Sequence, residues 1–423
     1  MYLRTPKRYT RGQKRSPISL RWLWLWILTP VVVLAGVEIY NRRETLGPPV
    51  HQAIYGVLDS AQHSLATAGA PPPPPTQDPR DQLERAAADW REGRIEAALN
   101  TYESILDAVP NDLQTHYRVT LGLAMEGSLD AALEAAERTI TADPLASDAW
   151  AIRAMVLDWS GRYGEAIASA LRAVELKSDN ARALAFLAEA YHDIGQSTLA
   201  LETVNRALEI NPDSFEALRV RGVLAWESEF DFNAARDYFE QAYELAPNLS
   251  YLAIDLALIN FLAFQDPEEA LGYLREVVET NPRNARALFE LGRVYYSGLG
   301  DPNQALDYLT RCVEVNPNNV LCQGLLGRVQ MALDNYTLAA EALKRAIDLG
   351  TRNPRHYLWA GRTQIALGSC PAAVPLLEQS IRLGTETGDT EAVTAAQDNL
   401  RECSIVLPGA GAEATPETAP DEG

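Results

Sequence analysis

The sequence predicts an all-α fold, a solenoid of about nine helix pairs closed by a C-terminal capping helix. Two observations support this prediction. A proline or turn residue recurs every 34 or 35 residues, at Pro110, Pro144, Ser178, Pro212, Pro247, Pro282, Pro317 and Thr351. An alanine lies twelve residues before each of these marks, and a further unit adds a ninth: Ala98, Ala132, Ala166, Ala200, Ala235, Ala270, Ala305, Ala339 and Ala373. Random placement would not keep nine alanines in register.

Each repeat is expected to contain two amphipathic helices that cross closely. In the fourth repeat, apolar residues recur at spacings of three and four, at Leu184, Leu187 and Tyr191 and then at Val204 and Leu208. An alanine at the tightest crossing lets two helix backbones approach, whereas a larger side chain would separate them. The proline that follows disfavours helix at the preceding residue and so ends each pair.

Three repeats are one residue longer than the others, and the extra residue falls in the turn between their two helices. These turns read SEFDFN, FQDPEE and GLGDPN. In two of them, Asp266-Pro267 and Asp301-Pro302 supply an N-cap carboxylate and a first-turn proline. The second helices of these repeats are therefore expected to begin at the prolines.

This pattern resembles the tetratricopeptide repeat family, whose unit of about 34 residues has large, Leu, Gly and Tyr positions in its first helix and Ala, aromatic, Ala and Pro positions in its second. The best matches are Leu184, Leu187, Ala188, Tyr191, Gly195, Ala200, Ala207 and Pro212 in one repeat, Leu288, Leu291, Gly292, Tyr295, Ala305 and Pro317 in another, and the aromatic positions Trp150 and Phe239. The resemblance covers residues 81–387, and residues 388–406 form the expected capping helix. It implies a right-handed superhelix whose first helices line a concave groove.

An apolar run at residues 22–40 predicts a transmembrane helix. Its 19 residues, WLWLWILTPVVVLAGVEIY, are enough to cross a bilayer core of about 30 Å, and three tryptophans stand within its first five positions. Seven basic residues precede the run and two follow it. The positive-inside rule then predicts that residues 1–21 form a basic cytoplasmic segment and that the body lies outside the cytoplasm. A cleaved signal peptide, with Val33 and Ala35 at the cleavage signature, is the alternative.

Residues 41–80 are expected to connect the membrane segment to the repeats. Apolar residues at helical spacing in residues 50–65 predict an amphipathic helix that lies on the membrane, associates with a second copy, or stays weakly ordered. The run Pro71–Pro75 predicts a stiff, extended spacer. At the other end, residues 407–423 contain several acidic and few large apolar side chains, and an acidic disordered tail is expected there.

Charge and motifs exclude several classes of function. The whole chain has a net charge of −20, but residues 1–43 carry +8, so the rest of the chain carries −28, which argues against nucleic-acid binding. The five histidines lack metal-ligand spacing, and no phosphate-binding or nucleophile motif is present. Residues 81–405 all fit a repeat or its cap, which leaves no room for a catalytic domain. We therefore expect no enzyme, no cofactor and no bound metal.

Four cysteines fall near the C-terminal end of the repeats. Cys312 and Cys322 are expected on neighbouring helices of the stack, and Cys370 and Cys403 on the last pair and the cap. Outside the cytoplasm an even number of cysteines permits disulfides, and of the three possible connectivities the pairing 312–322 with 370–403 is preferred. Four buried thiols that act as small hydrophobic side chains are the alternative.

The family resemblance also implies a partner-binding groove, lined by positions two, five, nine and twelve of each repeat. In the later repeats these positions, with near neighbours, carry five arginines and five aromatic residues: Arg286, Arg293, Arg328, Arg355, Arg362, Trp226, Tyr251, Phe261, Phe289 and Tyr296. A planar guanidinium binds carboxylates, and rings provide contact area, so a protein partner with an acidic segment is expected. Alternatively, the arginines pair with acids of neighbouring repeats and the rings fill the stack.

These expectations favour a membrane-anchored scaffold that holds protein partners on the extracytoplasmic side. An accessory or carrier protein for an envelope polysaccharide, with rings stacked on sugars, is the alternative. The Lys and Asn positions with which some family members clamp a C-terminal carboxylate are absent, so the sequence does not support that class of partner.

Overall fold

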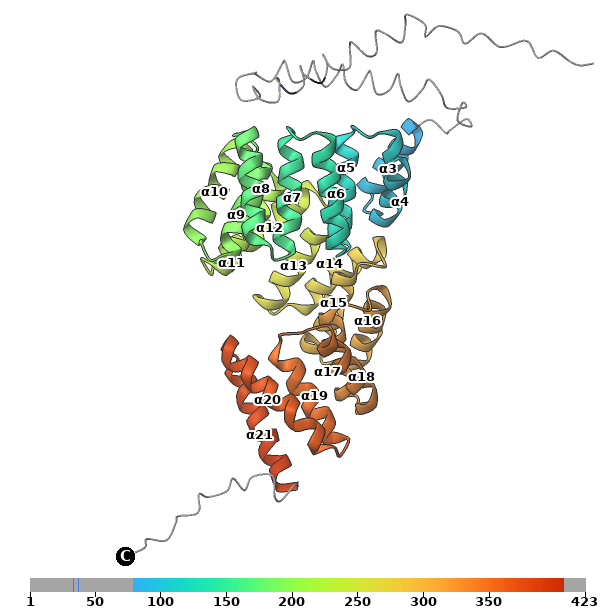
Figure 1. Cartoon of the computed structure of the whole chain (residues 1–423), viewed down its shortest axis with the longest axis vertical. Helices are drawn as coiled ribbons and strands as arrows, with labels where there is room; N and C mark the ends of the chain where they lie inside the picture. Colours follow the sequence, from blue (N-terminus) through green and yellow to red (C-terminus); the bar gives the residue numbers. More distant parts are fainter. Residues whose placement is uncertain (1–32, 34–36, 38–78, 407–423) are drawn as a thin grey trace, which may run out of the picture. The chain divides into compact units, whose positions relative to one another are not determined.

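The computed structural model describes residues 79–406, together with the isolated residues Val33 and Val37 (Figure 1). The predictions for residues 1–21, 22–40 and 407–423, and almost all of those for 41–80, concern residues outside this described part. Among the described residues, no helix is both long and apolar enough to span a bilayer.

The described chain is built from helix pairs, as the sequence predicted. The first helices of the nine pairs are α3 (Pro79–Arg91), α5 (Leu113–Met125), α7 (Ser147–Trp159), α9 (Ala181–Asp193), α11 (Phe215–Glu227), α13 (Ser250–Leu262), α15 (Ala285–Arg293), α17 (Val320–Ala332) and α19 (Pro354–Ala366). The second helices are α4 (Ile95–Ile105), α6 (Leu129–Ala142), α8 (Tyr163–Leu176), α10 (Ser197–Ile210), α12 (Phe232–Leu245), α14 (Pro267–Thr280), α16 (Pro302–Val315), α18 (Tyr336–Asp348) and α20 (Cys370–Thr387). A last helix, α21 (Thr390–Val406), packs on the ninth pair. Short turns η1 (Leu106–Ala108) and η2 (Val294–Gly298) extend α4 and α15. The all-α prediction is confirmed.

The recurring alanines lie where the two helices of each pair cross. All nine have 0% of their surface exposed. In the fifth pair, a Cβ atom added to Gly222 of α11 would lie 3.2 Å from the carbonyl oxygen of Ala235 on α12, and the same distance separates such a Cβ on Gly327 from the carbonyl oxygen of Ala339. Small residues on both helices therefore allow the close crossing that the sequence pattern predicted.

Two of the longer turns place a large non-glycine residue in the left-handed region. Phe230 and Gln265 occupy the left-handed region, at φ of 58° and 55°. Asp266 accepts a hydrogen bond from the backbone N–H of Glu269, and Asp301 caps α16 in the same way. The second helices of these two repeats begin at the predicted prolines, and in the seventh pair the π-helical turn η2 follows α15.

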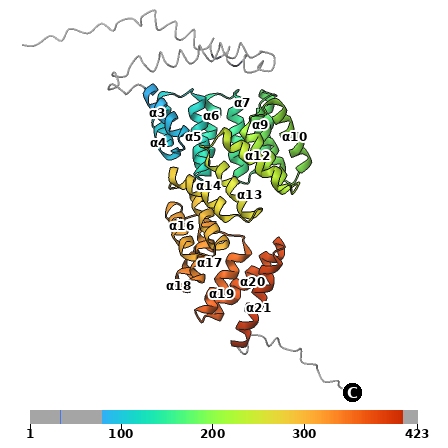
Figure 2. The same cartoon turned by 180° about the vertical axis from the view of Figure 1, so that it is seen from behind.

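The superhelix turns tightly enough for its first pair to contact the later pairs. The side-chain amide of Asn248, in the α12–α13 turn, donates to the backbone carbonyl of Trp90 at 3.1 Å. Arg283, in the α14–α15 turn, lies 3.7 Å from the carboxylate of Glu96 on α4. Figures 1 and 2 both show α14 beside the first pairs. One hydrophobic core accordingly runs from Ala86 on α3 to Leu252 on α13.

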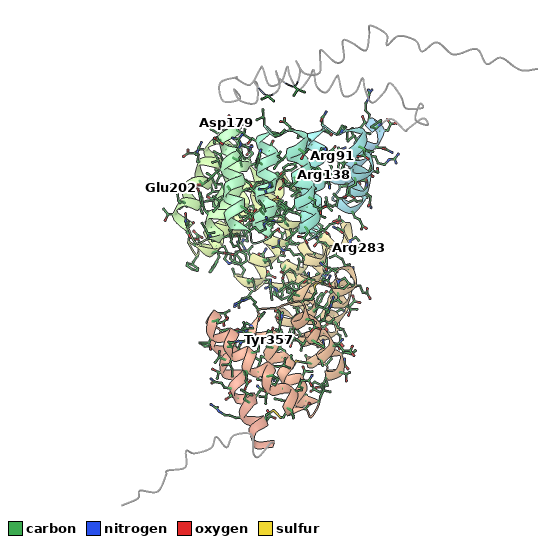
Figure 3. All side chains as sticks on the ribbon, viewed as in Figure 1. Arg91, Arg138, Asp179, Glu202, Arg283 and Tyr357 are labelled. Atoms are coloured by element: carbon green, nitrogen blue, oxygen red, sulfur yellow. A yellow bond between two sulfur atoms is a disulfide. The ribbon has the colours of Figure 1, made fainter. Side chains whose placement is uncertain are left out.

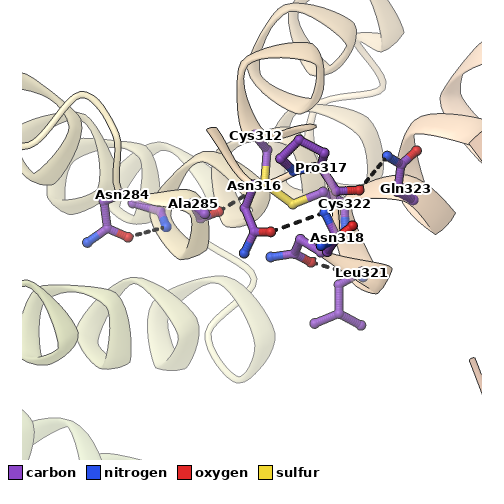
Figure 4. The surroundings of a disulfide bond; sticks show 11 residues. Asn284, Ala285, Cys312, Asn316, Pro317, Asn318, Leu321, Cys322 and Gln323 are labelled. Carbon is purple, nitrogen blue, oxygen red and sulfur yellow. Dashed lines mark hydrogen bonds between the residues drawn. A yellow bond between two sulfur atoms is a disulfide. The ribbon is translucent and has the colours of Figure 1, made fainter. Parts of the chain in front are cut away.

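Two disulfides join neighbouring helices at the C-terminal end. Cys312 of α16 is bonded to Cys322 of α17 across a Cα–Cα distance of 6.1 Å (Figure 4). Cys370 of α20 is bonded to Cys403 of α21 across 5.4 Å. The pairing in the structure is the connectivity preferred from the sequence. The first bond closes the α16–α17 turn, and the second ties the capping helix to the last pair.

Candidate functional site

The first helices of pairs two to seven line one partly open cavity. Its volume is about 330 Å³, and residues of α5, α7, α9, α11, α13 and α15 line it. Because six consecutive first helices contribute, they form the inner face of the superhelix. The α16–α17 turn adds Asn316 and Asn319 to the wall. The face that the family resemblance implied for partner binding is therefore the inner face of this array.

A buried charged cluster lies at the centre of this inner face. The guanidinium of Arg219 on α11 donates to Glu189 of α9 and to Asp255 of α13, both at 2.6 Å. All three side chains are at least nine-tenths buried. The same guanidinium lies 5.9 Å from the ring centroid of Trp159 and 5.4 Å from that of Tyr251. One arginine thus joins four first helices, and because the cluster is buried, removing one partner would leave an unpaired buried charge.

Asp158 on α7 is a further buried acidic residue near this cluster. Its side chain is 3% exposed, and neither carboxylate oxygen has a hydrogen-bond partner in the described part of the chain. Burial, together with the nearby carboxylates of Glu189 and Asp193, raises the pKa of Asp158 to about 9. The side chain is therefore held as a neutral carboxylic acid at neutral pH, which avoids the large cost of an unpaired buried charge.

The inner face of the later pairs carries alternating arginines and rings. We name Phe261, Arg293, Tyr296, Arg328 and Trp359 the cation–aromatic ladder. The guanidinium of Arg293 lies 5.6 Å from the Phe261 centroid, and that of Arg328 lies 5.7 Å from Tyr296 and 4.8 Å from Trp359. In the contacts of Phe261 with Arg293 and of Tyr296 with Arg328, a ring at position twelve of one repeat supports an arginine at position nine of the next. The stacking fixes the orientation of the guanidinium while leaving its N–H groups able to donate.

The structure places the other predicted arginines in different settings. Arg286 is 45% exposed and contacts Asp255 at 3.5 Å, whereas Arg355 donates to Asp389 and Glu391 of the capping segment. Arg293 of the ladder also forms an ion pair with the buried Glu290 at 2.6 Å. Arg362 is exposed, and within the described residues no ion pair or ring contact is found for it. Residue 331, at the ring position that would support Arg362, is a methionine.

The remaining predicted rings lie mainly in the core. Tyr251 is 5% exposed and packs edge-on against Trp159 with centroids 5.5 Å apart. Trp226 packs edge-on against Phe239 at 6.3 Å, and Phe289 is half-buried in the core of the later pairs. For these three residues the structure favours the alternative in which rings fill the stack. Tyr251 nevertheless lines the inner-face cavity, so its place in a partner-binding groove stays a prediction.

Sequence reasoning missed the buried cluster and one ring of the ladder. The inner-face positions nine, five and twelve of their repeats are occupied by Glu189, Arg219 and Asp158. Their positions within the repeat could therefore have identified them as candidate site residues. Trp359 lies at position six, which the repeat pattern does not assign to the groove, so the sequence did not identify it. The described residues include no group of three or more side chains suited to hold a metal ion.

Comparisons with known proteins agree with the repeat pattern. Two family models described as tetratricopeptide repeat match the chain, one at residues 160–224 and 297–358 and the other at residues 126–181 and 256–320. The chain therefore contains tetratricopeptide repeats, as predicted, and neither matching model describes an enzyme. The sequence matches no curated protein.

One solved structure shares the fold, and a second is reported for its similarity alone. The crystal structure of the APC/C hetero-tetramer Cut9-Hcn1 is similar with a TM-score of 0.59 and 15% identity, over 73% of this chain and 58% of that one. This chain thus matches little more than half the length of that neighbour, and at this identity the likeness concerns the fold alone. The crystal structure of PilW, a type IV pilus biogenesis factor, matches with a TM-score of 0.45 and 19% identity, over 51% of this chain and 98% of that one.

Proposed function

We propose that this array of tetratricopeptide repeats is a non-enzymatic scaffold that holds a protein partner against its inner face. The observation that carries the proposal is the cation–aromatic ladder, which offers oriented guanidinium groups inside an acidic body. Arg328 is half-buried and Arg362 is exposed, so both can donate to carboxylates of a partner. A partner that presents an acidic segment to the later pairs fits this surface best.

The polysaccharide alternative fits the ladder less well. A sugar stacks on the open face of an aromatic ring, whereas the guanidinium groups of the ladder already lie against the rings of Phe261, Tyr296 and Trp359. Carboxylates, in contrast, bind the guanidinium edges without displacing the stacked arrangement. For this reason the proposal names a protein partner.

Replacing Arg328 and Arg362 together by Glu is expected to abolish partner capture. The change removes two attractive charges and adds two repulsive ones, so we expect at least a tenfold loss of affinity, with exposed pairs contributing about 0.2–1 kcal/mol each and desolvated pairs more. The measurement is the amount of protein and of carbohydrate that co-purifies with the tagged full-length chain from its native membranes, as salt is increased.

A matched control carries the same charge change on second helices, with Arg345 of α18 and Arg382 of α20 replaced by Glu. Both side chains are exposed. The control should retain the captured protein. Equal capture by both variants would contradict a role for Arg328 and Arg362 in binding the partner, and capture of carbohydrate without protein would favour the polysaccharide alternative.

We further propose that residues 22–40 anchor the chain in the cell membrane as a single pass, with the N-terminus in the cytoplasm and the array outside it. The tryptophan-rich apolar run and the seven basic residues before it support this topology. A reporter that is active only in the cytoplasm should be silent when fused to the C-terminus. Strong activity of that fusion would show that the orientation is wrong.

A further inference from the structure

The turns between the two helices of pairs four to seven expose large apolar side chains. The corresponding turns of the first three pairs are polar and read EGR, EGS and SGR. In pairs four to seven, by contrast, each turn or its immediate flank places at least one large apolar side chain in solvent. We name the following five residues the turn edge: Ile194, Phe230, Phe232, Leu262 and Leu299. Phe230 is the most exposed of them, at 71%.

These four turns lie against one another. The hydroxyl of Ser228 in the fifth pair donates to that of Ser197 in the fourth at 3.2 Å. The guanidinium of Arg236, near the start of α12, lies 4.2 Å from the ring centroid of Phe264 in the sixth turn. A Cβ atom added to Gly298 in the seventh pair would lie 3.0 Å from the first residue of α14. Figure 1 shows the pairs from α9 to α16 in succession, so the turn edge is one continuous surface.

The longer turns of pairs five to seven share one backbone arrangement. In each of them, the N–H of the aspartate that caps the second helix donates to the carbonyl oxygen six residues earlier. These bonds measure 2.8 to 3.0 Å and join Asp231 to Ala225, Asp266 to Asn260, and Asp301 to Tyr295. The residue before the aspartate is left-handed in all three turns, with φ of 58° at Phe230, 55° at Gln265 and 65° at Gly300. Glycine adopts this conformation without strain.

Phe230 is the most strained of the three residues at this position. A bulky side chain is strongly disfavoured in the left-handed region. The exposed ring of Phe230 contacts no other ring and no guanidinium in the described part of the chain, so it gains little from burial. The extra residue in each turn also recurs on one face of the array, which is typical of a binding face. A strained, outward-facing ring at such a place indicates a contact with another molecule.

The charges around the turn edge indicate the kind of partner. Residues 193–199, 227–236, 262–269 and 296–304 contain eight acidic side chains and one basic one, Arg236. These carboxylates would repel an anionic lipid surface, and a second copy bound through the same edge would bring like charges together. A segment that combines apolar side chains with lysine or arginine is attracted by the carboxylates and covers the exposed rings and aliphatic groups.

We propose that the turn edge binds a segment of a partner protein in which apolar side chains are interspersed with lysine or arginine. That the segment belongs to a protein rests on the proposed scaffold function, whereas its chemistry follows from the turn edge. The turn edge lies beside the cation–aromatic ladder, because a Cβ atom added to Gly298 would also lie 2.8 Å from the ring of Phe261. The two surfaces select opposite charges, so one array can hold an acidic and a basic segment at the same time.

The test uses the full-length chain and a fluorescent peptide of four Lys-Leu-Gly units. Anisotropy titrations should show binding, and a peptide with serine in place of leucine should bind at least tenfold more weakly. Phe230→Gly should weaken binding of the leucine peptide at least tenfold, because a central aromatic contact is lost. The same substitution should not lower the melting temperature followed by circular dichroism, since it removes a strained, exposed side chain. Leu299→Ser, in another turn, should also weaken the binding.

Gln265→Gly provides the matched control, because it removes the left-handed side chain from the equivalent position of the next turn. This variant should keep the affinity for the leucine peptide. Equal affinities for the two peptides, or equal affinities of the native chain and the Phe230→Gly variant, would overturn the proposal. A lower melting temperature of Phe230→Gly would also overturn it, since the ring would then support the fold.

Two further measurements test other occupants of the turn edge. Sedimentation of the native chain and of Phe230→Gly detects a second copy, and flotation with phosphatidylcholine vesicles detects a lipid surface. We expect neither result to change with the substitution. A dimer that dissociates in Phe230→Gly, or vesicle binding that this variant loses, would overturn the assignment to a protein segment.

The ladder variant, Arg328→Glu with Arg362→Glu, separates this proposal from the scaffold proposal. It should still bind the leucine peptide even though its partner capture is lost, and loss of the peptide would show that the turn edge is not where the peptide binds. If the native chain fails to bind the peptide while ladder capture persists, only the present inference is wrong. Peptide binding without ladder capture would refute the ladder alone.

Discussion

Replacing Arg219 by Met should destabilise the array by about 3–5 kcal/mol, because the substitution leaves buried carboxylates without their counter-charge. Glu189 and Asp255 each accept a hydrogen bond of 2.6 Å from this guanidinium and have almost no contact with solvent. Methionine fills much of the arginine's volume but donates nothing. The loss should appear in chemical denaturation as a lower free energy of unfolding, with hydrogen exchange fastest in α9, α11 and α13.

Arg286 provides the matched control. It contacts the same carboxylate, Asp255, but it is 45% exposed and its contact is longer, at 3.5 Å. Its replacement by Met should therefore cost less than about 1 kcal/mol. A further variant that also neutralises the acids, with Glu189→Gln and Asp255→Asn added to Arg219→Met, should recover part of the loss. Similar stabilities for the two single variants would show that the buried cluster does not hold the first helices together.

Replacing Asp158 by Asn should make the array more stable at neutral pH and remove part of its pH dependence. The pKa of Asp158 is about 9 in the folded chain against an ordinary value of 3.8. Between these values the folded chain keeps a proton that the unfolded chain releases, so raising the pH favours unfolding. From pH 5 to pH 7 the native chain should lose about 2–3 kcal/mol relative to the Asn variant.

The measurement is the free energy of unfolding of both chains at several pH values. Asp179 offers the control because it is exposed (Figure 3), and its replacement by Asn should leave the pH profile unchanged. Parallel profiles for the native chain and the Asp158 variant would contradict a protonated, buried carboxyl group at this position.

Local periodicity made the repeat architecture predictable. Each alanine at a crossing reports a contact with the other helix of its own pair, as Ala235 does with Gly222 on the preceding helix. The disulfide pairing was predictable for the same reason, since Cys312 and Cys322 lie on adjacent helices. Contacts between helices that are adjacent along the chain can be predicted from a single sequence, because the residue spacing that creates them repeats.

The tight superhelical turn could not be predicted from residue spacing. Asn248 meets Trp90 across 158 residues, and the angle between successive pairs that brings them together depends on many small packing differences. The ladder was partly predictable because Arg293 and Arg328 recur in register. The ring contact of Trp359 was not, because position six is outside the set of positions that the family resemblance assigns to the groove.

We expect a protein partner to lie against the inner face of the later pairs, and site-specific photo-crosslinking in living cells can detect this contact. A photoreactive amino acid is placed in the full-length chain either at Arg362, on the inner face, or at Glu202, which is exposed on α10 (Figure 3). We expect a discrete protein adduct from position 362 that disappears when Arg328 is replaced by Glu, and no such adduct from position 202. The same adducts from both positions, or none from position 362, would contradict it.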